Sequence, residues 1–264
     1  MHITQHSIKF KIDKPERYNS NMAYSLYAIL CENISPEYAE KMHAQSEFRP
    51  ICQNLSFDRR ENIVEWNVTL FGEAQKEFAA ALELEEYHII NRDVVLKPVQ
   101  HSTAVYTTEY LLDKAKANAD NSAKANMLFC TPTSFKQNGE YAVFPSVELI
   151  LSSIAGMWSA YDETIKLNDP DVIGLLAKKI RISSYNLKSS YYRFKSVRIP
   201  AFTGRITLSA KLAPPLMEIY SLLLEFSNLS GAGIKNALGM GKIKTERIVY
   251  NERKQSFVQP GRNI

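Results

Sequence analysis

The sequence has few cysteines, and their placement does not suit a metal centre or a disulfide framework. Only Cys31, Cys52 and Cys130 occur among 264 residues, and no CxxC pair is present. Isolated, widely spaced cysteines are typical of reduced thiols in a cytosolic protein. The sequence therefore disfavours both a thiolate zinc site and a disulfide-rich secreted fold.

Long apolar runs are missing as well. The longest are far shorter than the ~20 residues that a membrane span needs, and the first thirteen residues do not form an apolar signal segment. Hydrophobic residues make up 45% of the chain, with ten glycines and eleven prolines, which is typical of a globular protein. We expect a soluble, cytoplasmic protein of one large or two ordinary domains, with no membrane partner.

The first half of the chain predicts the order strand, two helices, two strands, helix, strand. Alternating or β-branched residues predict strands at 7–12, 51–57, 63–71 and 94–110. Helices are expected at 22–33, from 36 to about 44, and at 73–84, which is rich in Ala, Glu, Lys and Leu. The resulting β-α-β-β-α-β order is that of the ferredoxin-like unit.

The second half repeats this order after a polar stretch at 114–124, which we interpret as the link between domains. Its many alanines leave a partly helical structure open. Strands are predicted at 127–134, 180–194, 196–211 and 242–250, and helices at 146–164 and 214–229. The halves share no visible sequence similarity. The expected fold class is therefore α+β, with two tandem ferredoxin-like (RRM-like, βαββαβ) domains at 1–118 and 123–264.

Acidic residues are absent from a long part of the second half. No Asp or Glu lies between Asp171 and Glu218, whereas nine Lys or Arg do. Basic side chains neutralise phosphates, and aromatic rings stack on unpaired bases. We predict a nucleic-acid surface, with a solvated strand pair that happens to lack acids as the alternative. Its basic candidates are Lys188, Arg193, Lys195 and Arg198, interleaved with Tyr185, Tyr191, Tyr192 and Phe194.

Glycine is scarce except in one segment near the C-terminus. Four of the ten glycines fall between Gly231 and Gly241, with three lysines in or just after them. Glycines allow positive φ, and successive amides can then form a nest for phosphates. The segment lacks the Gly-Lys-Ser/Thr of a P-loop and contains no GxGxxG, and the alternative is a helix C-cap with a tight turn. The candidate RNA contacts here are Gly231, Gly233, Lys235, Gly239, Gly241, Lys242 and Lys244.

The glycine spacing, Gly-x-Gly, five residues, then Gly-hydrophobic-Gly, resembles the signature of the CRISPR-associated repeat-RNA endoribonucleases. Three further segments are similar to that family in the right order: Met42-His43 ahead of Phe48-Arg49-Pro50, Thr-Pro-Thr-Ser-Phe at 131–135, and Gly-Arg-Ile-Thr-Leu at 204–208. The resemblance implies two ferredoxin-like domains that bind a CRISPR repeat and cut once within each repeat. It also implies a reaction without a metal ion, in which the 2′-hydroxyl is the nucleophile.

The implied reaction needs a base, an acid and a cation for the charge that develops on the phosphorane. Of the five histidines, the resemblance points to His43 as acid or base. Tyr27 is expected to orient the phosphate or His43, with Tyr24 as its competitor. The cation is Arg49 or, less favoured, Lys41, and Ser46 is a substitute hydrogen-bond donor. No cofactor or metal is expected, since no HExxH, Asp-x-Asp or His/Cys cluster occurs.

Three other classes of protein remain as alternatives. A non-catalytic RNA-binding subunit of a CRISPR effector complex would share the fold and the glycine segment. An unrelated RRM-like protein lacks support, because no RNP1 run occurs, and a nucleotide-dependent enzyme lacks its P-loop. The expected partners are precursor CRISPR RNA, a type I or type III interference complex, and a second copy of the chain.

Overall fold

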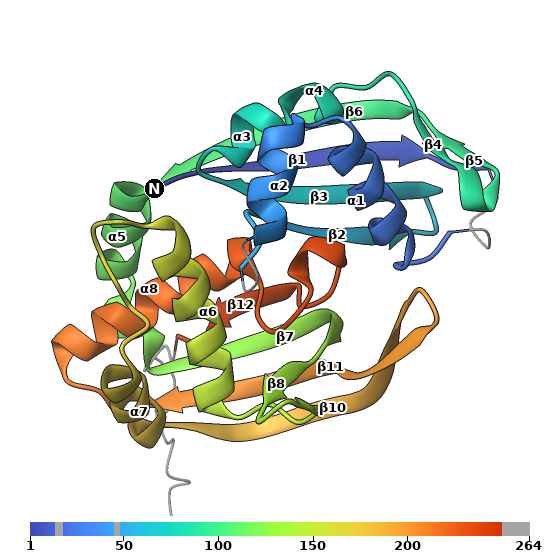
Figure 1. Ribbon diagram of the computed structural model, residues 1–264. Helices are drawn as coiled ribbons and strands as arrows, with labels where there is room; N and C mark the ends of the chain where they lie inside the picture. Colours follow the sequence, from blue (N-terminus) through green and yellow to red (C-terminus); the bar gives the residue numbers. More distant parts are fainter. Residues whose placement is uncertain (14–17, 45–47, 250–264) are drawn as a thin grey trace, which may run out of the picture.

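The computed structural model describes residues 1–13, 18–44 and 48–249 (Figure 1). Its first sheet has the strand order β2-β3-β1-β6, with each neighbouring pair antiparallel. The strands are β1 (His2–Lys11), β2 (Ile51–Asp58), β3 (Ile63–Phe71) and β6 (Pro98–Thr107). Helices α1 (Met22–Glu32) and α2 (Pro36–Ala44) connect β1 to β2, and the short helices α3 (Ala74–Glu77) and α4 (Ala79–Leu82) follow β3.

The second sheet has the order β10-β11-β7-β12, which is the same arrangement position by position. Its strands are β7 (Lys124–Thr133), β10 (Ile180–Phe194), β11 (Val197–Ala210) and β12 (Ile243–Arg247). The helices are α6 (Val147–Tyr161), α7 (Pro170–Lys179) and α8 (Pro214–Ser230), and the 3₁₀ turn η4 (Asn236–Leu238) lies in the glycine-rich segment. The expected α+β fold of two ferredoxin-like units is confirmed.

The polar stretch at 114–124 is mostly helical, the alternative that its alanines left open, and the predicted strand 94–110 is too long. The sheet strand β6 ends at Thr107, whose hydroxyl accepts a hydrogen bond from the amide of Tyr110 and caps helix α5 (Thr108–Ala117). Lys114 and Lys116 lie in the last turn, where positive charge complements the helix dipole. The 3₁₀ helix η3 (Ala119–Ala123) completes the connection and lies between the domains that we propose at 1–118 and 123–264.

Several small elements were missed by the sequence interpretation. They are the hairpin of β4 (Tyr87–Ile89) and β5 (Val94–Leu96) with η2 (Ile90–Arg92) between them, the hairpin of β8 (Phe135–Gln137) and β9 (Glu140–Ala142), and α7. The single helix expected at 73–84 is instead split into α3 and α4 at Phe78. Phe78 is fully buried there and meets the ring of Tyr38 edge-on, with 6.2 Å between the ring centres.

The two units share their cores rather than meeting at a thin interface. Ile3, Cys52 and Phe71 of the first sheet belong to the apolar cluster of the second unit, and Ala237 of the glycine-rich segment belongs to that of the first. Phe71 stacks on Tyr161 of α6, with ring centres 5.5 Å apart. Among the described residues, we find no helix long and apolar enough to cross a membrane.

A pair of histidines on neighbouring strands makes stability depend on pH. His6 Nδ1 lies 3.0 Å from His101 Nε2, and partial burial together with His101 lowers the pKa of His6 to about 4. As pH falls, His6 is therefore protonated near pH 6.5 in the unfolded chain, but only at lower pH in the folded chain. Protonation below pH 6.5 thus favours the unfolded chain. We expect the free energy of unfolding to fall by about 1–2 kcal/mol between pH 7 and 5, after allowance for solvent screening.

The measurement is urea unfolding at both pH values for the wild type and His6→Gln. The substitution should remove that part of the pH dependence. Equal pH dependence in the two proteins would show that His6 binds its proton normally in the folded state.

Candidate functional site

The candidate catalytic residues come from two neighbouring helices of the first unit and the segment that follows them. Tyr27 lies in the middle of α1, and His43 lies in the last turn of α2. Ser46 falls outside the described residues. The chain is described again from Phe48, so that Arg49 lies two residues before β2.

Tyr27 and Arg49 are brought together. Burial raises the pKa of Tyr27, its hydrogen bond to the thiol of Cys31 raises it further, and the positive charge of Arg49 opposes both effects. Arg49 has the same influence on the pKa values of Cys31 and Tyr161. Because Tyr27 stays protonated near neutral pH, its hydroxyl can donate a hydrogen bond to a phosphate oxygen.

Tyr24 and Lys41 have other neighbours. Burial, with a smaller effect of the nearby Tyr24, raises the pKa of Tyr192 of β10 to about 12. Lys41 forms an ion pair with Glu73, and this hydrogen bond and charge lower the pKa of the Glu73 carboxyl. Of the candidate cations, Arg49 thus acts on Tyr27, whereas Lys41 is engaged by Glu73.

Helix α6 of the second unit holds the segment that carries Arg49. The hydroxyl of Tyr161 donates to the carbonyl of Phe48 at 2.5 Å. A Cβ on Gly156 would lie 2.5 Å from Cζ of Phe48, so only glycine lets the phenyl ring approach the helix. Neither Gly156 nor Tyr161 was predicted from the sequence. The available signal was Gly156 itself, because a glycine inside a helix often has a packing reason.

The glycine-rich segment is built by internal hydrogen bonds. The amide of Ala232 donates to the carbonyl of Gly241 at 2.9 Å, Gly233 to Ser153 Oγ at 2.7 Å, and Gly241 to the carbonyl of Pro132 at 3.1 Å. The amide of Lys242 likewise donates to Thr131 Oγ1 at 2.9 Å. The nest of phosphate-binding amides expected from sequence is therefore wrong for these four groups, whose donors are already used.

The same segment is clamped onto helix α1. The side-chain amide of Gln53 donates to the carbonyls of Ala23 at 2.8 Å and Ala237 at 2.7 Å, and accepts from the indole of Trp66 at 2.6 Å. A Cβ on Gly239 would lie 2.6 Å from Cβ of Ala23. The glycines thus permit close packing between the units, on the helix that also carries Tyr27.

The three lysines of the segment have different surroundings. Lys242 is half-buried and donates from Nζ to the carbonyl of Asn228 at 2.5 Å, and burial lowers its pKa. Lys235 has a left-handed backbone conformation, and burial together with the nearby charge of Lys136 lowers its pKa. Lys244 is exposed. Lys235 and Lys244 are therefore better placed than Lys242 to meet a phosphate.

The basic stretch forms a long hairpin of β10 and β11 that reaches past the rest of the sheet (Figure 1). All four of its candidate contacts are exposed: Lys188, Arg193, Lys195 and Arg198. The guanidinium of Arg198 lies 3.6 Å from the centre of the Tyr191 ring. On the opposite face, Tyr192 donates its hydroxyl hydrogen bond to the carbonyl of Leu238 and fixes the hairpin to the glycine-rich segment.

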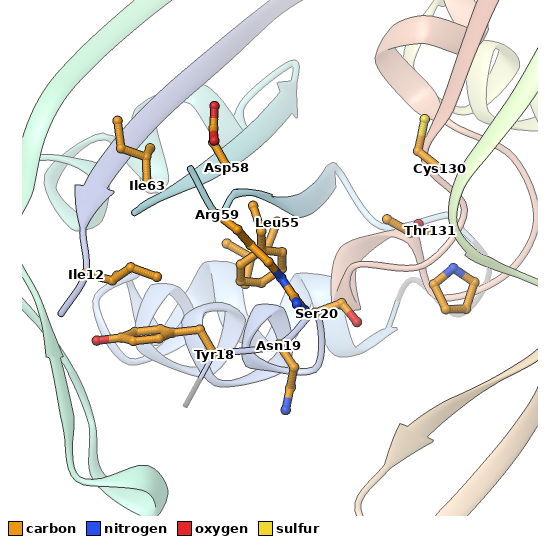
Figure 2. Close-up of a pocket in the computed structure, with 12 residues that line it drawn as sticks. Ile12, Tyr18, Asn19, Ser20, Leu55, Asp58, Arg59, Ile63, Cys130 and Thr131 are labelled. Carbon is orange, nitrogen blue, oxygen red and sulfur yellow. The ribbon is translucent and has the colours of Figure 1, made fainter. Parts of the chain in front are cut away.

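A cavity of about 300 Å³ opens between the two units (Figure 2). Asn19 and Ser20 ahead of α1 line it together with Arg59, which follows β2. From the second unit it is lined by Cys130 and Thr131 of β7, beside the glycine-rich segment. Arg59 points into this space in Figure 2 and adds a positive charge between the units.

Comparison with known proteins agrees with this architecture. The sequence model of the CRISPR-associated endoribonuclease Cas6 matches residues 127–243. A curated Cas6 endoribonuclease of Streptococcus thermophilus is 30% identical over 241 residues, which cover 89% of this chain and 95% of the relative. One from Mycobacterium tuberculosis is 24% identical, with 96% and 81% covered.

Solved structures show the same fold. A Cas6 product complex superposes with a TM-score of 0.74 at 22% identity, covering 93% of this chain and all of the other. Thermus thermophilus Cas6 superposes with a TM-score of 0.67 at 22% identity, covering 92% and 98%. With two ferredoxin-like units, the glycine-rich segment and a full-length relative at 30% identity, the chain belongs to the family of CRISPR-associated Cas6 endoribonucleases.

Proposed function

We propose that this chain cleaves CRISPR repeat RNA to release guide RNAs, acting in the cytoplasm without a metal ion. The observation that supports the site is that the charge of Arg49 reaches Tyr27 of α1, while His43 lies in the last turn of the next helix, α2. Family membership supports the RNA substrate. The 2′-hydroxyl attacks the adjacent phosphorus, the bond to the 5′-oxygen breaks, and the products carry a 2′,3′-cyclic phosphate and a 5′-hydroxyl.

Each residue has a role in this proposal. His43 transfers a proton, either from the 2′-hydroxyl or to the leaving 5′-oxygen, because imidazole titrates near neutral pH. The guanidinium of Arg49 stabilises the charge of the phosphorane. The hydroxyl of Tyr27 donates to a phosphate oxygen and fixes the scissile group, since its raised pKa keeps the proton in place.

The RNA is bound by both units. The exposed cations of the β10–β11 hairpin and of the glycine-rich segment lie on the second unit, whereas His43 lies on the first. A repeat that engages both must therefore pass across the junction that the glycine-rich segment forms with α1. An interference complex of type I or type III and a second copy of the chain are further proposed partners.

The test is cleavage of repeat RNA from the same CRISPR array in EDTA, with a second RNA carrying a 2′-deoxy sugar at the cut site. We expect the first RNA to be cut and the second to stay intact but bound. Tight binding without cutting would favour the non-catalytic subunit of an effector complex. Cutting of the deoxy RNA would contradict the proposed nucleophile.

The two candidate cations give separate expectations. Arg49→Met should lower the cleavage rate by about 100-fold, because no other described cation acts on Tyr27. Lys41→Met should change it less than about threefold, because Lys41 is held by Glu73 at an exposed ion pair. Single-turnover rates at saturating protein measure both. A larger loss for Lys41→Met than for Arg49→Met would assign the charge to Lys41.

A further inference from the structure

The β8–β9 hairpin lies next to the glycine-rich segment and continues its positive charge. The amide of Ile234 donates to the carbonyl of Ser134 at 2.9 Å, directly before β8. Lys136 of β8 is close enough to Lys235 for its charge to contribute to the lowered pKa of Lys235, after the larger effect of burial. Two lysines from different segments thus face one region of the surface, where they would repel each other less with a phosphate between them.

Aromatic rings lie beside Lys136 and in the segment that follows the hairpin. Lys136 pairs across the hairpin with Tyr141, and its Nζ lies 6.0 Å from the centre of the Tyr141 ring. Three residues later, Phe144 meets Tyr185 of β10 edge-on, with ring centres 5.6 Å apart. Phe144 is 57% exposed and Tyr185 is 65% exposed. Exposed apolar groups that lie together, unlike single ones, often mark a binding surface.

The charges beside these rings favour a polyanion over an apolar protein surface. Tyr185 lies in the stretch from Asp171 to Glu218 that contains no acid. The one acidic residue in the β8–β9 hairpin is Glu140, next to its turn. Exposed rings close to ammonium groups suit the bases and phosphates of a single strand, whose bases are free to stack.

We propose that the β8–β9 hairpin and the adjoining part of β10 form a track for single-stranded RNA, in which Lys136 and Lys235 hold phosphates while Tyr141 and the Phe144–Tyr185 pair stack on unpaired bases. This rests on the proposed function and extends it. The enzyme would then hold an unpaired part of its RNA on the second unit, apart from the residues around His43.

The test distinguishes the contribution of the bases to binding from that of the phosphates. Binding is measured with a short oligoadenylate and with an RNA of equal length made of abasic riboses, which keeps every phosphate. Wild type should bind the oligoadenylate tighter by about 5- to 100-fold, since stacking acts only on bases. Phe144→Ala combined with Tyr185→Ala should bring this ratio to about one, whereas Tyr185→Phe should keep it.

The contribution of Lys136 and Lys235 is tested by the salt dependence of RNA affinity. Lys136→Ala combined with Lys235→Ala should weaken binding of both RNAs by the same factor. It should also reduce the slope of log affinity against log salt by about 1.4, at ~0.7 per phosphate on a single strand.

The matched control for the aromatic variant is Tyr110→Ala, which removes a tyrosine of 49% exposure on α5 and should leave the base preference intact.

The outcomes distinguish this track from the catalytic proposal. A wild type that cuts repeat RNA but shows no base preference would overturn the track alone. A ring-dependent preference in a protein that never cuts would support the track and overturn the proposed activity. An unchanged preference in the double aromatic variant, or an equal loss in Tyr110→Ala, would overturn it in favour of another use of these rings, such as a protein contact.

Discussion

His43→Ala should lower metal-free cleavage of repeat RNA by about 100- to 10,000-fold, the usual contribution of a positioned acid or base. The affinity for the RNA should stay within about threefold, because binding draws on many cations spread over both units. His43 lies in the last turn of α2, and the contacts of Phe48 with Tyr161 and Gly156 of α6 do not involve its side chain, so alanine leaves them in place.

The measurement is the single-turnover rate in EDTA alongside the dissociation constant from the same RNA. His88→Ala is the matched control, since His88 is an exposed histidine of β4 that pairs with Glu86. A parallel loss of affinity and rate in His43→Ala would make the histidine a binding residue. An equal loss in His88→Ala would indicate a general effect on the fold.

Gly241→Ala should cost at least about 2 kcal/mol of stability more than Gly139→Ala. Both glycines have positive φ, +74° and +83°, so the cost of placing alanine in that conformation is similar, about 1–2 kcal/mol. The difference lies in their surroundings. A Cβ at position 241 would lie 2.2 Å from the carbonyl oxygen of Ala232, whereas position 139 has no atom within 4 Å.

The clash at position 241 involves backbone on both sides, so it can be relieved only by moving the glycine-rich segment. Chemical denaturation of the two variants measures the difference. We also expect Gly241→Ala to cut repeat RNA more slowly, because the segment is clamped to the helix that carries Tyr27. Equal stabilities for the two variants would mean that the segment adapts freely and that its glycines serve another purpose.

The arrangement of strands followed from sequence because each half contains long runs with a clear period. Residues 63–71 were predicted with their observed limits, and α1 to within one residue. The start of the helix before the linker was missed. The stretch at 114–124 was left open as partly helical, but α5 begins at Thr108, inside the strand predicted at 94–110, because Thr107 caps it there.

The candidate site was predictable in its parts but not in its connections. Family resemblance chose Tyr27 and Arg49, yet nothing in the sequence showed that Arg49 acts on Tyr27 while Lys41 pairs with Glu73. Those facts depend on contacts between residues far apart in the chain. The glycine spacing did not show that the amides of Ala232, Gly233, Gly241 and Lys242 are used in hydrogen bonds within the protein.

The shared core described above bears on how this enzyme accommodates its RNA. Gln53 ties the glycine-rich segment to α1, and Phe71 and Tyr161 stack across the junction. Opening the junction by a hinge would break buried hydrogen bonds and expose aromatic surface, so large rotation of one unit against the other is disfavoured. The binding surface of the protein is therefore nearly rigid. The free-energy cost of reaching the geometry for cleavage falls mainly on the RNA. RNAs that bend and unpair easily are then cleaved in preference to stiffer ones.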